Sequence, residues 1–360
     1  MSEAALKERY DRQIRVWGAE AQSRIQNSRV LVLGLQGLNV EATKNLVLAG
    51  MSVTVQDDTT VALEDLSFNF FLSSEDVGRP TAEAAMPRIH QLNTFTTVSV
   101  EMRALKNLDA AFFAPFTVVL MSAKNSTQAE ALRVNELCRQ EGGEGGNKKK
   151  VFFLSDVFGH ESFFISDFGQ GFQFQPDKKE KKEPVAAAAA PAAAGGGGSV
   201  DDDIVLLAAP AAPESLAGEG GVNILTIDFP PLSRVLGKPW AELPSRHFPL
   251  SKTFVKARLL ALYRDEHAGA IPTPQSRDAF RSWAERIAKQ NAIELATTLS
   301  DADIEELCRT AGCTPIVTCS TLGSFLAQET IKGVSLSGHP AFNVWVFSCH
   351  DYQVRAFPVA

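Results

Sequence analysis

Short apolar runs alternate with amphipathic stretches along most of the chain. Five of the runs have the length and composition of strands that are covered on both faces. They lie at residues 30–33, 52–55, 98–102, 117–121 and 151–154. Helical patterns lie between several of them, at residues 40–49, 81–92 and 126–140. Because strands and helices alternate, we expect an α/β fold with a doubly wound, mostly parallel sheet.

The two ends of the chain have their own patterns. An amphipathic helical lead-in is expected over residues 1–28, and an apolar helix over residues 315–332. Gly323 lies inside the second helix, where glycine costs about 1 kcal/mol relative to alanine, so we expect close packing against another backbone there. Further strands and helices are expected at residues 204–208, 223–229, 253–264 and 276–291. Two antiparallel strands are expected at residues 342–347 and 352–357.

Two stretches interrupt this alternation. Residues 176–203 read PDKKEKKEPVAAAAAPAAAGGGGSVDDD, a low-complexity segment that cannot form a packed core, so we expect a disordered insertion. Residues 1–175 and 204–360 are then the two parts of one domain. The KKEKK run in the insertion fits either a solvated charged segment or a nuclear-localisation signal. Residues 141–150, EGGEGGNKKK, indicate a loose surface loop.

Composition excludes several classes of function. The chain has 360 residues and a net charge of −7, which argues against general binding to nucleic acid or to an anionic membrane. No apolar run is long enough to span a bilayer, and the charged start is unlike a secretory signal. The five cysteines are scattered without a Cys-x-x-Cys pair, which is typical of free thiols in a reducing compartment and predicts no metal site.

A glycine turn between the first two strands could hold a nucleotide. Residues 30–58 read VLVLGLQGLNVEATKNLVLAGMSVTVQDD, a strand, a turn with Gly34 and Gly37, a helix and a strand that ends at Asp57. In a dinucleotide site the glycines admit the pyrophosphate and the acid holds a ribose hydroxyl. Gln36 and Asn39 stand where small residues are usual and would crowd a phosphate. The unit therefore supports the fold better than it supports an occupied site.

Several motifs together point to one family. RYDRQIRVWG at residues 9–18, the glycine-turn unit, SDVFGHESFFISDFG at 155–169 and LGSFLAQETIKGV at 322–334 resemble the ubiquitin-like-protein activating enzymes and their bacterial sulfur-carrier adenylating relatives. The resemblance implies a Rossmann-like adenylation domain. SDVFG and the short chain favour the smaller subunits of heterodimeric SUMO-activating enzymes over the longer Nedd-type subunits, which stay the alternative.

Active members of this family carry an ATP site that this chain has lost at four places. GLQGLN replaces GxGGxG, and Asn69 is followed by two phenylalanines where an arginine is expected after it. Residues 78–81 read GRPT in place of a lysine-bearing element, and Lys124 precedes Asn125 where the family has an acid that helps to hold Mg²⁺. A lysine cannot ligate Mg²⁺ and would repel it. We therefore expect this chain to bind no cofactor or metal, and ATP and Mg²⁺ to lie in a partner subunit.

The resemblance gives Arg12 a separate role. In this family the arginine of the YDRQ element reaches from one subunit into the ATP site of its partner. A guanidinium is always charged and donates several hydrogen bonds to phosphate oxygens. The alternative is that Arg12 pairs with Asp11 or Glu8 on its own helix. Arg15 is expected to be structural, and Tyr10 and Trp17 to be packing residues.

The resemblance thus implies a non-catalytic, regulatory subunit that is inactive alone. With a larger catalytic subunit carrying the ATP pocket, zinc and a transfer cysteine, it would support adenylation of the SUMO C-terminus and then thioester formation. The partner surface is expected at Phe70, Phe71 and the helix over 322–332, and the location in the nucleus and also the cytoplasm. Two other hypotheses are an NAD-binding oxidoreductase, suggested by the turn and Asp57, and a pure scaffold in which Arg12 is silent.

Overall fold

A nine-stranded sheet forms the centre of the molecule. The computed structural model describes residues 8–140, 150–176, 204–206, 214–217, 223–243 and 250–359. The strand order is β3-β2-β1-β4-β5-β6-β11-β12-β8. The first five of these strands are parallel, with bounds Val98–Glu101 (β3), Ser52–Gln56 (β2), Arg29–Leu33 (β1), Val118–Ser122 (β4) and Val151–Phe158 (β5). This confirms the expected α/β class with a mostly parallel sheet.

The other half of the sheet is mainly antiparallel. Its strands are β6 (Glu161–Asp167), β11 (Val344–Ser348), β12 (Gln353–Phe357) and β8 (Ile204–Leu206), of which only β8 runs parallel to its neighbour. The antiparallel pair at the end of the chain was expected from the sequence. The β5–β6 hairpin was not, because both strands are buried along their whole length and show no alternation of apolar and polar residues. A second sheet joins β7 (Phe172–Phe174), β10 (Asn223–Ile227) and β9 (Glu214–Ala217).

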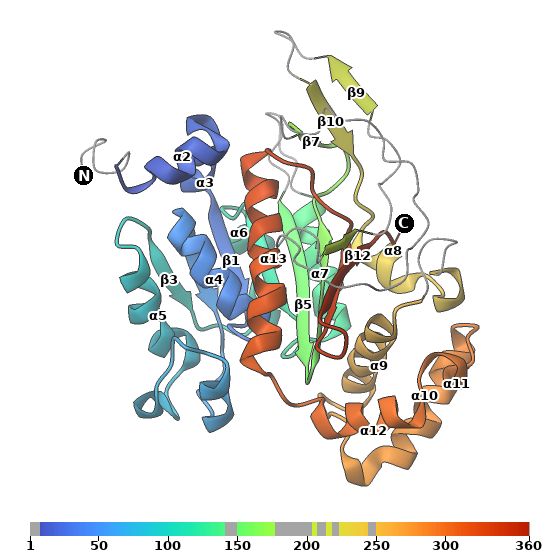
Figure 1. The fold of residues 1–360 in the computed structure, drawn as a ribbon. Helices are drawn as coiled ribbons and strands as arrows, with labels where there is room; N and C mark the ends of the chain where they lie inside the picture. Colours follow the sequence, from blue (N-terminus) through green and yellow to red (C-terminus); the bar gives the residue numbers. More distant parts are fainter. Residues whose placement is uncertain are drawn as a thin grey trace, which may run out of the picture.

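Helices cover both faces of the large sheet. In Figure 1, α4 and α13 lie side by side in front of the parallel strands, and α7 lies behind β5. The longer helices are α3 (Ala19–Asn27), α4 (Leu38–Ala49), α5 (Thr81–Leu92), α7 (Gln128–Gln140), α9 (Lys252–Glu266), α10 (Arg277–Gln290), α12 (Asp301–Thr310) and α13 (Ile316–Ser335). The shorter ones are α2 (Asp11–Trp17), α6 (Ala110–Phe113), α8 (Leu232–Gly237) and α11 (Leu295–Thr298). Short 3₁₀ helices in the described ranges are Leu63–Ser67, Ser74–Asp76, Leu105–Asn107, Trp240–Glu242 and Pro274–Ser276.

The lead-in is two helices, which corrects the single helix expected over residues 1–28. Gly18 ends α2 and precedes α3 with a φ of 91°, a left-handed value that a helix interior does not allow. Gly50, in contrast, ends α4 in the expected left-handed conformation, with φ 105° and ψ 11°. The expected close packing at Gly323 is also confirmed: a Cβ there would lie 2.8 Å from the Cβ of Glu41 and 3.0 Å from the carbonyl oxygen of Leu38.

Some expectations fall on residues outside the described ranges. They are the loop over residues 141–150 and the insertion over residues 176–203, apart from Lys150 and Pro176, and both stay predictions. Among the described residues, none of the helices is long and apolar enough to cross a membrane. The same residues hold no group of three or more His, Cys, Asp or Glu side chains arranged to bind a metal ion.

Candidate functional site

The glycine turn follows β1 at the carboxyl edge of the sheet. Gly34 and Gly37 have φ values of 80° and 52°, and the amide of Gly34 donates to the carbonyl oxygen of Gln56 at 2.8 Å. A Cβ on Gly34 would lie 3.2 Å from the Cβ of Ser122, and one on Gly37 would lie 3.0 Å from a methyl group of Val157. Both glycines are thus required by the backbone conformation and by the neighbouring strands, whether or not a phosphate binds.

Asn39 fills the space beneath the turn. Its side chain is fully buried, and its Nδ2 donates to the carbonyl oxygen of Gly34 at 3.0 Å. The hydroxyl of Ser155 on β5 donates to Asn39 Oδ1 at 3.1 Å. Both ends of the amide are therefore used to tie the turn to the sheet. The residue expected to crowd a phosphate instead acts as a structural bridge.

Asp57 is also occupied by its own chain. Its Oδ2 accepts the amide of Leu35 in the turn at 2.9 Å, and its Oδ1 accepts the amide and hydroxyl of Thr59 at 3.0 and 2.6 Å. Burial raises the pKa of Asp57 above its usual value, although these hydrogen bonds oppose the shift. Both carboxyl oxygens thus hold the turn and the residues after β2, and Oδ2, with one donor, keeps a further acceptor position.

Lys124 lies close to the same turn. Its Nζ donates to the hydroxyl of Thr314 at 3.0 Å and lies 5.4 Å from the centre of the Phe68 ring. A hollow of about 180 Å³ lies here, lined by Gln36, Gly37, Leu38, Ser122, Lys124, Ser155, Asp156, Val157 and Thr314. Gln36 Oε1 is buried and has no hydrogen-bond partner among the described residues. An ammonium group thus occupies the place where the resemblance puts a ligand of Mg²⁺.

Asn69 is turned toward the glycine turn as well. Its Nδ2 donates to the carbonyl oxygen of Leu35 at 3.2 Å, and its Oδ1 accepts the amide of Phe71 at 3.1 Å. Phe70 is exposed, but Phe71 is only 2% exposed and belongs to this chain's own core. Placing Phe71 on a partner surface was therefore wrong, because its ring is already covered.

A second hollow lies on the other side of the turn. Its volume is about 310 Å³ and its lining is Leu33, Gly34, Gln56, Asp57, Asp58, Leu105, Met121, Ser122, Asn125 and Ser126. Two of these residues are acids and none is basic, so the charge of this hollow disfavours a polyphosphate. The structure thus gathers Gly34, Gly37, Asp57, Asn69 and Lys124 at one edge of the sheet, beside two hollows.

Arg12 lies away from this edge. Helix α4 begins at the turn, while α2 packs near the far end of α4 (Figure 1). Twelve residues of α helix span about 18 Å, so Arg12 is too far away to serve the turn of its own chain.

The side chain of Arg12 is also free of its neighbours. Arg12 is exposed, and in the part of the chain that the structure describes no hydrogen bond or ion pair joins it to another residue. Asp11 instead pairs with Arg15, with 2.8 Å between Nη2 and Oδ2. The structural role of Arg15 stays a prediction, since this pair is exposed, and the alternative pairing of Arg12 with Asp11 or Glu8 is not observed among the described residues.

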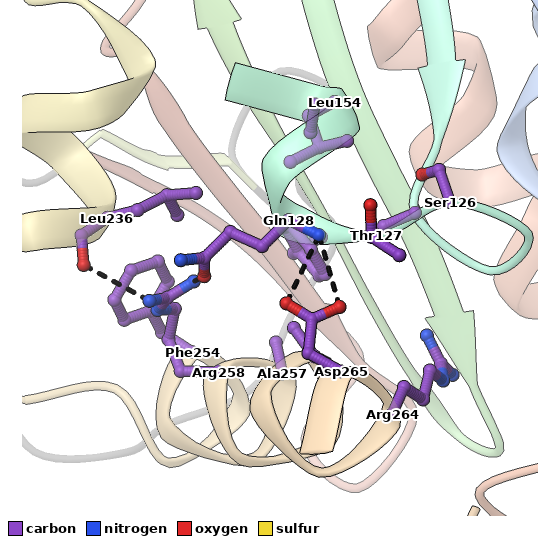
Figure 2. Close-up of a pocket in the computed structure, with 14 residues that line it drawn as sticks. Ser126, Thr127, Gln128, Leu154, Leu236, Phe254, Ala257, Arg258, Arg264 and Asp265 are labelled. Atoms are coloured by element: carbon purple, nitrogen blue, oxygen red, sulfur yellow. Dashed lines mark hydrogen bonds between the residues drawn. The ribbon is translucent and has the colours of Figure 1, made fainter. Parts of the chain in front are cut away.

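A larger hollow lies elsewhere, between α7 and α9 (Figure 2). It has a volume of about 470 Å³ including open solvent. Arg258 donates to Gln128 Oε1 at 2.9 Å and to the carbonyl oxygen of Leu236 at 3.1 Å, while Asp265 accepts the amide of Gln128 at the start of α7. Burial lowers the pKa of Arg258 to about 10.

Sequence reasoning missed this buried polar layer on α9. Three basic residues of the helix are buried, namely Lys256, Arg258 and Arg264. Lys256 pairs with Glu161 at 3.0 Å, and Arg264 pairs with Asp156, so α9 is joined to the β5–β6 hairpin by charge. In the sequence, this layer is indicated only by basic residues that stand within an apolar helical pattern. Their acidic partners could not be identified from a single sequence.

The cysteines give no sign of a transfer site. All five are free thiols, and Cys138 and Cys319 are buried as expected. Burial raises the pKa of Cys319 to about 12, which makes its thiol unreactive. Cys313 is exposed and Cys349 is half-buried.

Comparison with known proteins gives a consistent result. Residues 10–360 match the model of the ThiF family. A stretch of 162 residues, 45% of this chain, is 36% identical to SUMO-activating enzyme subunit 1 of Homo sapiens and covers 44% of that protein. A stretch of the same length is 35% identical to SUMO-activating enzyme subunit 1 of Dictyostelium discoideum and covers 46% of it. The matched part thus spans less than half the length of these curated relatives. Because the family model covers nearly all of the chain, the chain belongs to the ThiF family.

Proposed function

We propose that this chain is the smaller, regulatory subunit of a SUMO-activating enzyme. Together with a larger catalytic subunit it supports ATP-dependent adenylation of the SUMO C-terminus and the thioester formation that follows. The names of the similar proteins support this assignment. The chain is inactive alone, ATP and Mg²⁺ bind in the partner, and the assembly works in the nucleus and also in the cytoplasm.

One observation carries the proposal: the chain has an exposed arginine without a partner among the described residues, on a helix remote from its own glycine turn. Arg12 lies on α2, which contacts the far end of α4, a helix about 18 Å long that begins at the turn. Supplied to another subunit, its guanidinium would stabilise the charge that develops as the acyl-adenylate forms and pyrophosphate leaves. We therefore assign Arg12 to the partner's ATP site.

The surface beside α4 and α13 suits a large subunit. Val317 and Ile316 at the start of α13 are 56% and 48% exposed, Leu48 on α4 is 41% exposed, and so is Phe70. The ring of Phe70 lies 5.5 Å from Nζ of Lys44, which places it next to α4. Because α13 passes the start of α4 at Gly323, residues 316–317 and Leu48 lie toward opposite ends of the two helices, and together they mark a broad surface of the extent that a large protein interface needs. The expected helix over residues 322–332 contributes mainly its polar outer face.

The alternatives are less well supported. An NAD-binding oxidoreductase needs a small residue at the second glycine position of the turn so that the pyrophosphate can approach, but Gln36 stands there. A Nedd-type subunit would have the same fold, and only the modifier can separate it from the SUMO assignment. A pure scaffold would leave Arg12 without a role.

The proposal is tested by ATP–pyrophosphate exchange with purified SUMO. The chain alone, a candidate larger subunit alone and their mixture are compared, and a Nedd-type modifier replaces SUMO in a parallel series. We expect exchange only in the mixture with SUMO. In that mixture Arg12→Ala should lower exchange by about 100-fold, as the loss of one charge-stabilising donor does, while the matched control Arg15→Ala should not.

Three results would contradict the proposal. Exchange by this chain alone would mean that GLQGLN binds ATP. Exchange only with the Nedd-type modifier would move the chain to the alternative pathway. Normal exchange by the Arg12→Ala mixture would leave the chain as a scaffold.

A further inference from the structure

Helix α2, which carries Arg12, is attached mainly through the residues at its two ends. All seven of its residues are described, and none of them is buried. Between the ends, the side-chain amide of Gln13 makes one long contact of 3.4 Å with the carbonyl oxygen of Leu48. Seven residues are too few for a stable helix in isolation, so the attachments must set the position of α2.

The first attachment is Tyr10, the residue before α2. Tyr10 is 2% exposed, and its hydroxyl accepts a hydrogen bond from Asn93 Nδ2 at 2.8 Å. Asn93 is 1% exposed and also donates to the carbonyl oxygen of Val47 at 2.8 Å, so its position is fixed by the last turn of α4. The phenol thus reaches a rigid, buried partner.

Gly50 lets the tyrosine ring approach the end of α4. A Cβ on Gly50 would lie 3.0 Å from the hydroxyl oxygen of Tyr10 and 3.1 Å from Cζ of the same ring. Only a residue without a side chain leaves room for the ring here. The left-handed backbone at Gly50 therefore serves both to end α4 and to seat Tyr10.

The second attachment is at the other end of α2 and reaches the same place. Trp17 Nε1 donates to Gln22 Oε1 at 2.8 Å, and Gln22 Nε2 donates to the carbonyl oxygen of Ala49 at 3.1 Å. Both attachments therefore lead to residues 47–50 at the end of α4. The strand–turn–helix unit therefore supports α2, the helix that carries Arg12, through the end of α4. It has this role even though we expect its turn to bind no nucleotide.

We propose that Tyr10 is a positioning residue for Arg12. Its hydroxyl, held by Asn93, fixes the start of α2 and so sets where the Arg12 guanidinium, two residues later, reaches beyond the chain. The buried ring of Tyr10 and the hydrogen bond from Arg9 Nη2 to the carbonyl oxygen of Leu92 at 3.2 Å also hold this point, so we expect loss of the Tyr10 hydroxyl to shift the helix start only slightly while the rest of the fold stays in place. This inference rests on the proposed function, since it concerns the path by which Arg12 enters a partner's ATP site.

The test compares four forms of the chain in the complete heterodimer: wild type, Tyr10→Phe, Arg12→Ala and the double variant. Tyr10→Phe keeps the ring and removes only the hydroxyl. At saturating partner, SUMO and ATP we expect it to lower the exchange rate by about 5-fold, the rate equivalent of one hydrogen bond. The double variant should be no slower than Arg12→Ala, because the hydroxyl acts only through the arginine. Tyr352→Phe is the matched control, since Tyr352 is 77% exposed.

Two further readouts separate positioning from general stability. The affinity of the Tyr10→Phe chain for the larger subunit should equal that of wild type, as should the protection of β1 and β4 amides in hydrogen exchange. The amides of residues 11–17 should exchange faster. A merely structural role would change the partner affinity or the strand amides as well.

The outcomes distinguish this inference from the proposed function. Three results would overturn the inference while Arg12 kept its role. They are normal exchange by Tyr10→Phe, a double variant in which the effects of the two substitutions multiply, and a loss confined to partner affinity. Normal exchange by Arg12→Ala would instead remove the trans role itself, and the positioning role with it.

Discussion

Asn39 Nδ2 donates a hydrogen bond to the carbonyl oxygen of Gly34, so the first residue of the glycine turn is held from below by a buried amide. The same amide accepts the hydroxyl of Ser155, which links the turn to β5. In a dinucleotide-binding turn this is the third glycine position, which is kept small so that the helix packs closely on the strand. In this chain Asn39 stands at that position and makes two hydrogen bonds, and their contribution to the free energy of unfolding can be measured.

We predict that Asn39→Ala lowers the free energy of unfolding by about 2 kcal/mol, because it removes two hydrogen bonds, one to the half-buried carbonyl oxygen of Gly34 and one from the buried Ser155 hydroxyl, which keeps only a long contact of 3.4 Å with the carbonyl oxygen of Met121. Asn45→Ala on the same helix is the control. Asn45 is half-buried and donates to Glu41 at 3.2 Å, so its loss should cost about 0.5 kcal/mol. Urea unfolding monitored by circular dichroism gives both values. Equal losses of unfolding free energy in the two variants would show that the hydrogen bonds of Asn39 stabilise the fold no more than the half-buried contact of Asn45 does.

Gly323 provides a second test of packing. A Cβ there would lie 2.8 Å from the Cβ of Glu41, and neither backbone can move easily, so Gly323→Ala should cost about 2 kcal/mol through overpacking. Gly237, the last residue of α8, has no atom within 4 Å of a Cβ placed on it. Gly237→Ala should therefore be neutral or stabilise the chain by up to about 0.5 kcal/mol. Thermal unfolding of the two variants checks the contrast, and a stable Gly323→Ala chain would refute the close approach of α13 to α4.

The order of strands and helices could be predicted because each parallel strand is a short apolar run with a helix after it. The roles of Gly50 and Gly323 could also be predicted, because Gly50 follows a clear helical pattern and Gly323 lies inside one. The β5–β6 hairpin was missed because its strands are buried on both faces, so period-two alternation is lost. The break at Gly18 was missed because one glycine inside a polar helical pattern does not fix its own φ.

The candidate site was predictable only in part. Spacing located Gly34, Gly37 and Asp57, and the resemblance identified Arg12. Neither could reveal that Asn39 bridges to Ser155 or that Asp57 caps its own turn, because those contacts join residues that are far apart in the sequence. The neighbours of Arg12 could not be deduced either, since Asp11 lies within reach of two arginines and only the structure assigns it to Arg15.

Asp303 gives a prediction that depends on pH. Burial alone would raise its pKa, but hydrogen bonds from Ser300 and the ammonium groups of Lys252 and Lys256 lower the pKa well below its usual value. A carboxyl whose pKa is lower in the folded state stabilises that state above its unfolded pKa of about 3.9, and the stabilisation is lost as the pH falls below that value.

We therefore expect Asp303→Asn to be about 2 kcal/mol less stable than wild type at pH 7, with the difference shrinking at pH 3 and below. Urea unfolding over this pH range measures it. Asp301→Asn, at an exposed position of the same helix, is the control and should show a small difference throughout. A gap between Asp303→Asn and wild type that stays constant with pH would contradict the ionic origin of the effect.

Substitution of Lys124 tests whether one change is enough for the glycine turn to bind a nucleotide. Lys124→Asp would return an acid to the place where the family has a ligand for Mg²⁺, and would remove the hydrogen bond to Thr314 and the contact with Phe68. We expect no binding of Mg²⁺ or ATP by calorimetry, because Asn39 still fills the space beneath the turn and the oxygens of Asp57 stay engaged. We also expect a loss of about 1 kcal/mol in stability from the lost hydrogen bond. Lys124→Met separates the two effects, since it removes the charge without adding an acid. Binding of Mg²⁺–ATP by Lys124→Asp but not by Lys124→Met would mean that the lysine alone closes the site, and that the bridge at Asn39 yields to a nucleotide.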